Sequence, residues 1–176
     1  IGGQAKGQMV REIDALGGVM GLAADRSGLQ FKILNRSKGK AVWSPRAQVD
    51  KRTYEQYVNA YIYSSNRIKV VVGEAVSLQV KNNSVEGVIL RGGEKLFARS
   101  VVLTCGTFLN GLVHVGERKI VAGRMGEGGA KGITEFLVSL GFSSGRLKTG
   151  TPPRLVAQSI NWGKTNITLG DEKPTP

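Results

Sequence analysis

Cysteine and histidine are almost missing from this sequence: among its 176 residues, Cys105 and His114 are the only examples of each. A single cysteine excludes a framework of internal disulfides and is compatible with a reducing compartment. Without clustered thiols and imidazoles, the sequence also lacks the ligand set of a structural zinc site. No apolar run approaches the length needed to cross a bilayer, so we expect no membrane-spanning helix.

Acidic side chains are scarce as well. The chain carries 25 Lys and Arg against 13 Asp and Glu, which gives a formal net charge of +12 at pH 7. A hydrophobic content of 40% is ordinary for a globular protein, and this length is enough for one good core. A strong positive excess on such a domain favours an anionic partner: a nucleic acid, a phosphate-rich ligand or an anionic membrane.

Basic residues are concentrated between Phe31 and Lys69, where nine Lys or Arg face only two acids, and Trp43 lies among them. Cations interleaved with an aromatic suit an RNA surface, because phosphates need charge and a splayed base needs a stacking face. The alternative is a solvated helix face and loop, with Trp43 covering the core. If the RNA interpretation holds, Lys38, Lys40 and Arg46 are candidate contacts.

The stretch RLKTGTPPR, residues 146–154, is the most informative motif. Its cations Arg146, Lys148 and Arg154 frame a Thr-Gly-Thr turn. Backbone N–H groups beside a turn glycine, with hydroxyls and guanidinium groups around them, form an anion-binding concavity. The Pro-Pro pair fixes an extended path, so less ordering is needed on binding. A basic surface loop that ends at prolines is the alternative.

Periodicity predicts a mixture of helices and strands, and therefore the α/β class. We expect helices over Met9–Leu16, Tyr54–Ile62 and Ile133–Leu140, with Asp50 as the N-cap of the second. We expect a loop over Ser37–Pro45 and strands over 29–34, 68–72, 75–80, 85–90, 95–98 and 101–103, with another within 160–169. Asn82-Asn83 and Gly92-Gly93 are hairpin signals, so the strands over 75–98 form a β-meander.

The run VVLTCGT, residues 101–107, follows this meander. In flavoproteins with two dinucleotide-binding domains, a meander and a final strand that ends in a Thr-Gly turn complete the FAD domain. Gly106 would then lie against the ligand, where any Cβ would collide. No complete phosphate-binding glycine loop occurs, so an FAD domain would need its first strand and glycine turn before Ile1.

Cys105 invites a catalytic interpretation because a thiol near a flavin can form covalent intermediates. A single cysteine at the end of a buried strand more often serves as a small apolar residue. We favour the structural role and assign no catalytic residue in this chain.

Five stretches, read in order, resemble the glucose-inhibited division protein A family, also called GidA or MnmG. They are IGGQAKG, VREIDALGGVMG, LQFKILNRSKGKAVWSPRAQVDK, LTCGTFLNG and GRLKTGTPPR. The resemblance implies part of the FAD domain of a two-dinucleotide-binding-domain flavoprotein plus an inserted α+β domain. It suggests boundaries at 1–107 and 108–170, with 171–176 as a tail or linker.

The family modifies the wobble uridine of tRNA by 5-carboxymethylaminomethyl or aminomethyl addition, using FAD, NADH and methylenetetrahydrofolate. It acts with a GTPase partner, MnmE. The resemblance therefore implies tRNA and an MnmE-type GTPase as partners, a homodimer, and a cytoplasmic location, or a mitochondrial one for a eukaryotic source. The two cysteines implicated in the family fall before Ile1 and beyond Pro176, so Cys105 matches neither.

The resemblance also implies FAD contacts. Ala75 and Val76 match the stretch at the adenine end, and Gly2 and Gly3 match a turn near the flavin. The remaining matches are Thr104, Gly106 and Thr107 in the turn beside the cofactor, and Gly123, Arg124 and Gly126 in a glycine-rich loop. That loop departs from the family at Gly128-Gly129-Ala130, where Pro-Pro-Ser is common. Two alternatives stay open: a non-catalytic RNA-binding module, and a related folate- and FAD-dependent tRNA methyltransferase.

Overall fold

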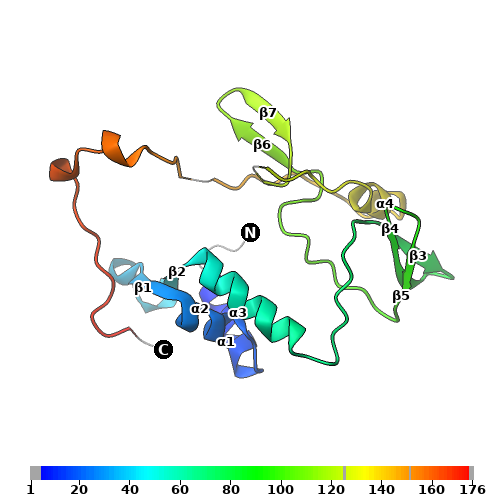
Figure 1. Ribbon diagram of the computed structural model, residues 1–176, viewed down its shortest axis with the longest axis horizontal. Coiled ribbons are helices and arrows are strands. Elements are labelled where there is room, and N and C mark those ends of the chain that lie inside the picture. Colours follow the sequence, from blue (N-terminus) through cyan, green and yellow to red (C-terminus); the bar gives the residue numbers. More distant parts are fainter. Residues whose placement is uncertain (1–4, 125, 151, 175–176) are drawn as a thin grey trace. The chain divides into compact units, whose positions relative to one another are not determined.

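The computed structural model describes residues 5–124, 126–150 and 152–174. Its internal contacts divide the chain into two compact units. The first unit contains Ile1–Val70 and Thr149–Pro176, and the second contains Val71–Lys148. Each unit combines helices with strands (Figure 1), which confirms the predicted mixture of helix and sheet.

The described residues of the first unit form three α-helices: α1 (Ala5–Ala15), α2 (Met20–Ser27) and α3 (Lys51–Tyr63). Helix α1 ends where predicted, because Gly17 takes a positive φ of 86° and its N–H donates to the Asp14 carbonyl. Asp50 caps α3 as expected, since its Oδ1 accepts from the backbone N–H of Thr53 at 2.8 Å. Helix α2 was not predicted, because eight residues give too short an apolar repeat.

The first unit also contains an antiparallel pair, β1 (Gly28–Leu34) and β2 (Ser44–Val49). The predicted strand at 29–34 is confirmed, but the predicted loop over Ser37–Pro45 is shorter than expected. Two 3-10 turns, Arg36–Lys38 and Lys40–Val42, connect the strands, and β2 already begins at Ser44. The polar sequence of β2, with Pro45 near its start, hides the strand from a hydrophobicity pattern.

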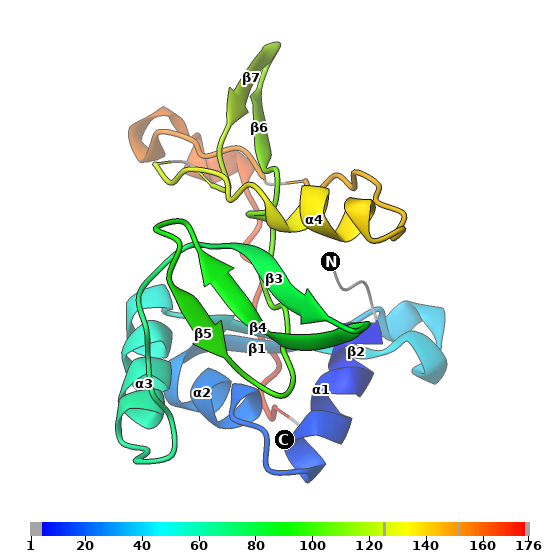
Figure 2. The same cartoon turned by 90° about the vertical axis from the view of Figure 1, so that its right-hand side faces the viewer.

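The second unit is built on the predicted meander, which is confirmed as the sheet β3-β4-β5 (Figure 2). Its strands are β3 (Ala75–Lys81), β4 (Ser84–Leu90) and β5 (Lys95–Phe97). Asn82 and Asn83 both take positive φ values, of 49° and 60°, as a tight hairpin turn between twisted strands requires. A further hairpin, β6 (Leu112–Val115) with β7 (Arg118–Val121), was not predicted.

Helix α4 (Ile133–Ser139) packs on β3, and Gly141, with φ 93°, ends it as predicted. Ile133 is 2% exposed, so α4 begins with its apolar side chain fully buried. None of the described helices is long and apolar enough to cross a membrane.

Three predicted strands are wrong: within the described residues, 68–72, 101–103 and 160–169 form none. The last range holds a 3-10 turn, Trp162–Lys164, instead. β-branched runs have strand propensity, but a strand also needs a neighbour to satisfy its backbone groups. The sheets of the described chain offer these segments no such neighbour. Their side chains are accordingly exposed, Val72 by 95% and Val102 by 83%.

Gly87 provides a test of the meander. A Cβ at this buried position would overlap the carbonyl oxygen of Leu96 on β5. We expect Gly87→Ala to reduce the free energy of unfolding by about 2 kcal/mol, because the β4–β5 pair must separate or shift. The measurement is denaturant unfolding of the protein.

Gly92→Ala is the matched control, because it lies in the turn between the same strands and its Cβ would meet nothing within 4 Å. Equal stability of the two variants would show that the close approach of β4 and β5 at Gly87 is wrong.

Candidate cofactor cavity and basic surfaces

A cavity of about 520 Å³ lies within the second unit. It is bordered by the residues that lead into β3, by the turn around Cys105, by the loop 128–130 and by Ile133 at the start of α4. Apolar side chains supply much of its lining, chiefly Leu103, Phe108, Leu109, Ala130 and Ile133. An apolar cavity with backbone polar groups at its edge is the common form of a small-molecule site.

Several residues predicted to contact FAD gather around this cavity although they are distant in sequence. Ala75 and Cys105 line it, and Thr104 and Gly106 flank Cys105 on the same turn. Thr107 Oγ1 donates to the carbonyl of Gly123 at 3.4 Å. Gly123 is buried against Phe108, because a Cβ at Gly123 would overlap the Phe108 ring. The structure therefore brings the predicted turn and the predicted glycine loop together beside one wall of the cavity.

Other described residues predicted to contact FAD are not among those that line the cavity. The carbonyl of Val76 faces Gly132, where no Cβ could fit, so Val76 supports the start of α4. Arg124 forms an ion pair with Glu127 in the same loop, and Gly126 there takes a positive φ of 84°. Gly2 and Gly3 lie outside the described residues.

Two glycines near the cavity have open space where a side chain would stand. Gly106 is exposed, takes a φ of 57°, and has no atom within 4 Å of the place where its Cβ would stand. Gly128 is open in the same way, so both leave backbone groups accessible to a ligand. Glu74 is held by Arg91 at 2.6 and 2.5 Å, and this hydrogen-bonded ion pair lowers the pKa of the Glu74 carboxyl. Exposed Gly128 therefore lines the same cavity as an ionised acid whose charge is balanced by Arg91.

Cys105 is half-buried in this wall. Among the described residues, no imidazole or carboxylate forms a hydrogen bond with its thiol, and no group of His, Cys, Asp and Glu could hold a metal ion. A nucleophilic thiol needs a base or a cation that stabilises its thiolate. The structural role that the sequence suggests for Cys105 stays a prediction. The preceding residues form no strand, so its predicted place at a strand end is wrong.

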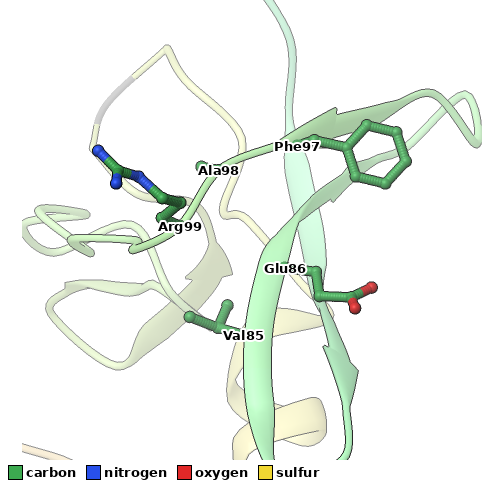
Figure 3. A pocket seen from close by; sticks show the side chains of 5 residues that line it. All are labelled: Val85, Glu86, Phe97, Ala98 and Arg99. Carbon is green, nitrogen blue, oxygen red and sulfur yellow. The ribbon is translucent and has the colours of Figure 1, made fainter.

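A second hollow, of about 550 Å³, lies on the meander and is lined by Val85, Glu86, Phe97, Ala98 and Arg99. Figure 3 shows Glu86 and Phe97 pointing to one side of the strands while Arg99 points to the other. Its polar groups do not converge, and none of the predicted site residues lies there. The cavity beside Cys105 is the better candidate for a ligand.

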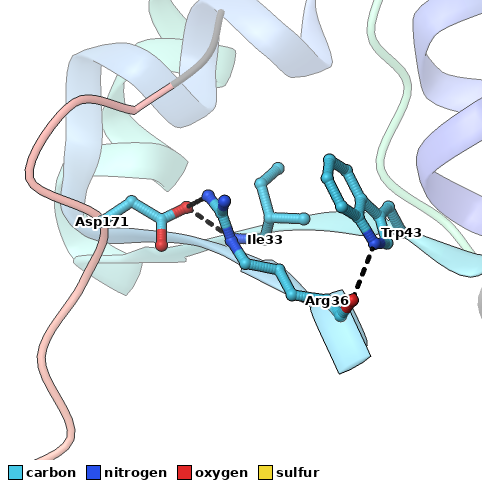
Figure 4. Close-up of polar contacts among 4 residues, drawn as sticks. All are labelled: Ile33, Arg36, Trp43 and Asp171. Carbon is cyan, nitrogen blue, oxygen red and sulfur yellow. Dashed lines mark hydrogen bonds and ion pairs between the residues drawn. The ribbon is translucent and has the colours of Figure 1, made fainter. Parts of the chain in front are cut away.

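Residues 35–43, between β1 and β2, form the basic loop of the first unit. Asp171, which sequence analysis missed, holds this loop in place. Asp171 Oδ2 accepts from the backbone N–H of Ile33 and from Arg36 Nη2, both at 2.8 Å (Figure 4). The carbonyl of Arg36 accepts from Trp43 Nε1 at 3.2 Å, and the Arg36 guanidinium lies 5.6 Å from the centroid of the Trp43 ring. No local pattern in the sequence marks Asp171 as a partner of Arg36, because the two residues are 135 positions apart.

These contacts hold the 3-10 turns that carry Lys38 and Lys40, both exposed. Arg46 lies on β2 and donates to Gln30 Oε1 at 3.1 Å. Trp43 is half-buried, and the Arg36 guanidinium lies beside its ring. Arg36 therefore already occupies part of the stacking surface predicted for Trp43.

The basic motif RLKTGTPPR spans the division between the units. Arg146 and Lys148 belong to the second unit and Arg154 to the first. Arg146 Nη1 donates to the carbonyl of Asn110 at 3.0 Å, which attaches the start of the motif to the loop beside the cavity. Lys148 and Arg154 are exposed.

Comparison with known proteins gives a match over the whole chain. The family described as "Glucose inhibited division protein A" matches residues 1–176. The tRNA uridine 5-carboxymethylaminomethyl modification enzyme MnmG of Flavobacterium johnsoniae is 47% identical over 174 residues, which are 99% of this chain and 28% of that protein. The enzyme of the same name from Chlorobium phaeobacteroides is 48% identical over 177 residues, again covering 28% of its length.

A solved structure agrees with the fold. The structure of Aquifex aeolicus GidA in its form II crystal is 45% identical and superposes with a TM-score of 0.86. The match covers 99% of this chain and 29% of that one. The chain therefore spans somewhat more than a quarter of the length of the relatives it matches.

The Asp171 contacts predict a pH dependence. The backbone hydrogen bond from Ile33 and then the Arg36 side chain hold the pKa of Asp171 below its ordinary value of 3.8. A depressed folded-state pKa means that the stabilisation is fully present above pH 3.8 and is lost as the pH falls through the lower, folded value. We expect hydrogen exchange over Gly28–Leu34 to be faster in Asp171→Asn than in the wild type at pH 7, with the ratio of rates approaching one only once the pH is below the lowered pKa of Asp171.

Taking the ratio at each pH removes the intrinsic pH dependence of exchange. Asp50→Asn is a control, because it changes an acid of the same unit that has no part in these contacts. A ratio of one at pH 7 would mean that Asp171 does not fasten β1.

Proposed function

Because this chain belongs to the glucose inhibited division protein A family, we propose that it is part of an FAD-dependent enzyme that modifies the wobble uridine of tRNA by 5-carboxymethylaminomethyl or aminomethyl addition. The observation that carries the proposal is the match over the full chain to relatives named as tRNA uridine 5-carboxymethylaminomethyl modification enzymes. The cavity beside Cys105 and the basic surfaces supply the two kinds of site that such an enzyme needs.

We assign the cavity of the second unit to FAD. The cofactor supplies the redox chemistry, and this chain binds and orients it. The exposed backbone around Gly106 and Gly128 serves as hydrogen-bonding rim, and the apolar wall with Phe108 and Ile133 excludes water. Ala75 lies where β3 begins at the cavity edge, in keeping with its proposed place near the adenine end.

This assignment makes the fold part of the FAD domain of a two-dinucleotide-binding-domain flavoprotein, with an inserted α+β domain. The boundaries at 107 and 170 are proposed on the same basis. Gly2, Gly3, Val76, Thr104, Thr107, Gly123, Arg124 and Gly126 remain proposed FAD contacts. Cys105 is proposed to be structural.

The tRNA surface is assigned to the cations of the basic loop and of the motif. Lys38 and Lys40 are exposed on turns that Asp171 and Trp43 hold in place, so little ordering is needed when phosphates bind. Lys148 and Arg154 are exposed in the same motif.

The remaining parts of the proposal concern the whole protein. NADH and methylenetetrahydrofolate are its proposed co-substrates, and an MnmE-type GTPase and a second copy of the protein are its proposed partners. The proposed location is the cytoplasm.

A non-catalytic RNA-binding module is the second candidate, favoured by the net charge of +12. It predicts RNA binding by a protein that holds no flavin. A folate- and FAD-dependent tRNA methyltransferase would hold flavin, but would be expected to lack the basic motif at 146–154.

Gly106 provides the test for FAD. We expect Gly106→Asn in the full-length protein to weaken FAD binding by at least about tenfold, because the new side chain would fill open space next to Cys105 that we assign to the cofactor. Asn tolerates the φ of 57° at this position, so backbone strain stays small. Flavin fluorescence titration gives the affinity.

Gly116→Asn is the matched control. Gly116 has a φ of 59° and also has nothing within 4 Å of the place of its Cβ, but it lies in the turn between β6 and β7. FAD affinity that is unchanged in Gly106→Asn would remove Gly106 from the site, and a wild-type protein without flavin would support the RNA-binding module.

The tRNA surface can be tested through salt dependence. Each cation that contacts a phosphate contributes about one to the slope of log affinity against log salt. We expect the pair Lys38→Ala and Lys40→Ala, and separately the pair Lys148→Ala and Arg154→Ala, to reduce the magnitude of the slope by about two each. Filter binding or fluorescence anisotropy with tRNA measures it.

The control pair is Lys81→Ala with Lys95→Ala, which removes the same charge from the meander. If all three pairs change the slope equally, the effect is one of net charge and neither surface is a specific contact.

A further inference from the structure

Asn110 uses three polar groups to connect three parts of the second unit. Its backbone N–H donates to the carbonyl of Ala130 at 2.9 Å. Its side-chain Nδ2 donates to Glu135 Oε1 on α4 at 2.8 Å. Its carbonyl accepts from Arg146 Nη1 of the basic motif at 3.0 Å. The glycine-rich loop, the helix and the motif therefore meet at this one residue.

The backbone beside Asn110 forms a wall of the cavity. The N–H of Ala130 donates to the carbonyl of Phe108 at 2.8 Å, and Leu109 pairs with Ala130 as a short parallel bridge. Phe108, Leu109 and Ala130 all line the cavity. Asn110 itself takes a φ of 47°, which Asn tolerates better than most residues. Its contacts thus fix the conformation of the loop at the point where the cavity wall ends.

Glu135 holds Asn110 and the start of α4 at the same time. While Oε1 accepts from Asn110, Oε2 accepts from the backbone N–H of Gly132 at 2.8 Å, as an acid in the first turn of a helix commonly does. The hydrogen bond from Asn110, followed by those from the helix start, holds the pKa of Glu135 below its ordinary value. The carboxylate is therefore ionised at neutral pH, and both of its oxygens are needed.

Arg146 differs from three other arginines of the described chain in how its charge is balanced. Arg36, Arg91 and Arg124 each form an ion pair with a carboxylate. Arg146 contacts a neutral carbonyl instead, and the described residues place no carboxylate in an ion pair with it. Its charge is not compensated, and a guanidinium has five N–H donors, so it can keep the Asn110 contact while it binds a phosphate.

We propose that Asn110 is a positioning residue through which Arg146 and Glu135 fix the cavity wall, and that this contact couples anion binding at the basic motif to ligand binding in the cavity. A phosphate on Arg146 orders its side chain and so strengthens its hold on Asn110. A ligand in the cavity orders the same loop from the other side. The two binding events then favour each other by the same factor, because linkage is reciprocal. The identity of the two ligands, FAD and tRNA, rests on the proposed function.

The positioning part is tested without any ligand by hydrogen exchange of the full-length protein. We expect Asn110→Gly to speed exchange in peptides that cover 108–112 and 128–132, because Gly accepts the positive φ but cannot bond to Glu135. Glu135→Gln is the second variant: its amide has one oxygen in place of two, so it cannot accept from both Asn110 and Gly132. Unchanged exchange in both variants would overturn the positioning role.

The coupling part is tested by measuring FAD affinity with and without saturating tRNA. We expect tRNA to tighten FAD binding of the wild type by about fivefold, the lower end of common coupling factors. Arg146→Ala should reduce this factor to one. Lys148→Ala is the matched control: it removes a cation of the same motif, so it should weaken tRNA binding and leave the factor unchanged.

A wild-type factor of one, or a factor that survives Arg146→Ala, would overturn the coupling. A wild-type protein that binds neither FAD nor tRNA would overturn the proposed function instead, and the exchange measurement would still decide the role of Asn110.

Discussion

The second unit depends on the burial of the Ile133 side chain. This side chain is 2% exposed, and it anchors the first turn of α4 against β3 and the cavity. With the helix start fixed, Gly132 lies so close to the carbonyl of Val76 that no Cβ could fit. Glu135 is then in place to accept from both Gly132 and Asn110, and the loops of the cavity follow from these bonds. One buried apolar side chain thus sets the geometry of a largely polar network.

Local patterns in the sequence predicted the parts of the fold that local interactions determine. The meander was predictable because Asn82-Asn83 and Gly92-Gly93 mark its turns, and α3 because Asp50 caps it. The strands expected at 68–72 and 101–103 do not form, because a strand depends on a neighbour that propensity does not report. β2 escaped notice for the opposite reason: β1 pairs with it although its own sequence is polar.

Only part of the candidate site could be predicted from the sequence. The turn around Gly106 and the motif at 146–154 were found from glycine and charge patterns and from the family resemblance. Asp171 and Asn110 could not be found, because each acts through partners far away in sequence: Asp171 contacts Arg36 135 residues before it, and Arg146 contacts Asn110 across 36 residues. An isolated Asp or Asn in a loop carries no local signal for such a partner.

The contact of Asp171 with β1 also has a consequence for the order of folding. The second unit is inserted within the first, since Val71–Lys148 lies between the two segments that form it. During synthesis, α1 to α3 and the β1–β2 pair precede the inserted unit. Two contacts of β1 can form only after that unit has left the ribosome: Gln30 Nε2 donates to the Thr168 carbonyl, and the Asp171 N–H donates to the Phe31 carbonyl. Contacts of such long sequence separation form slowly, and an unpaired strand edge exposed in the meantime is open to wrong partners. The inserted unit contains only contacts within 78 consecutive positions, so it can complete its own fold while the first unit still waits for its last segment.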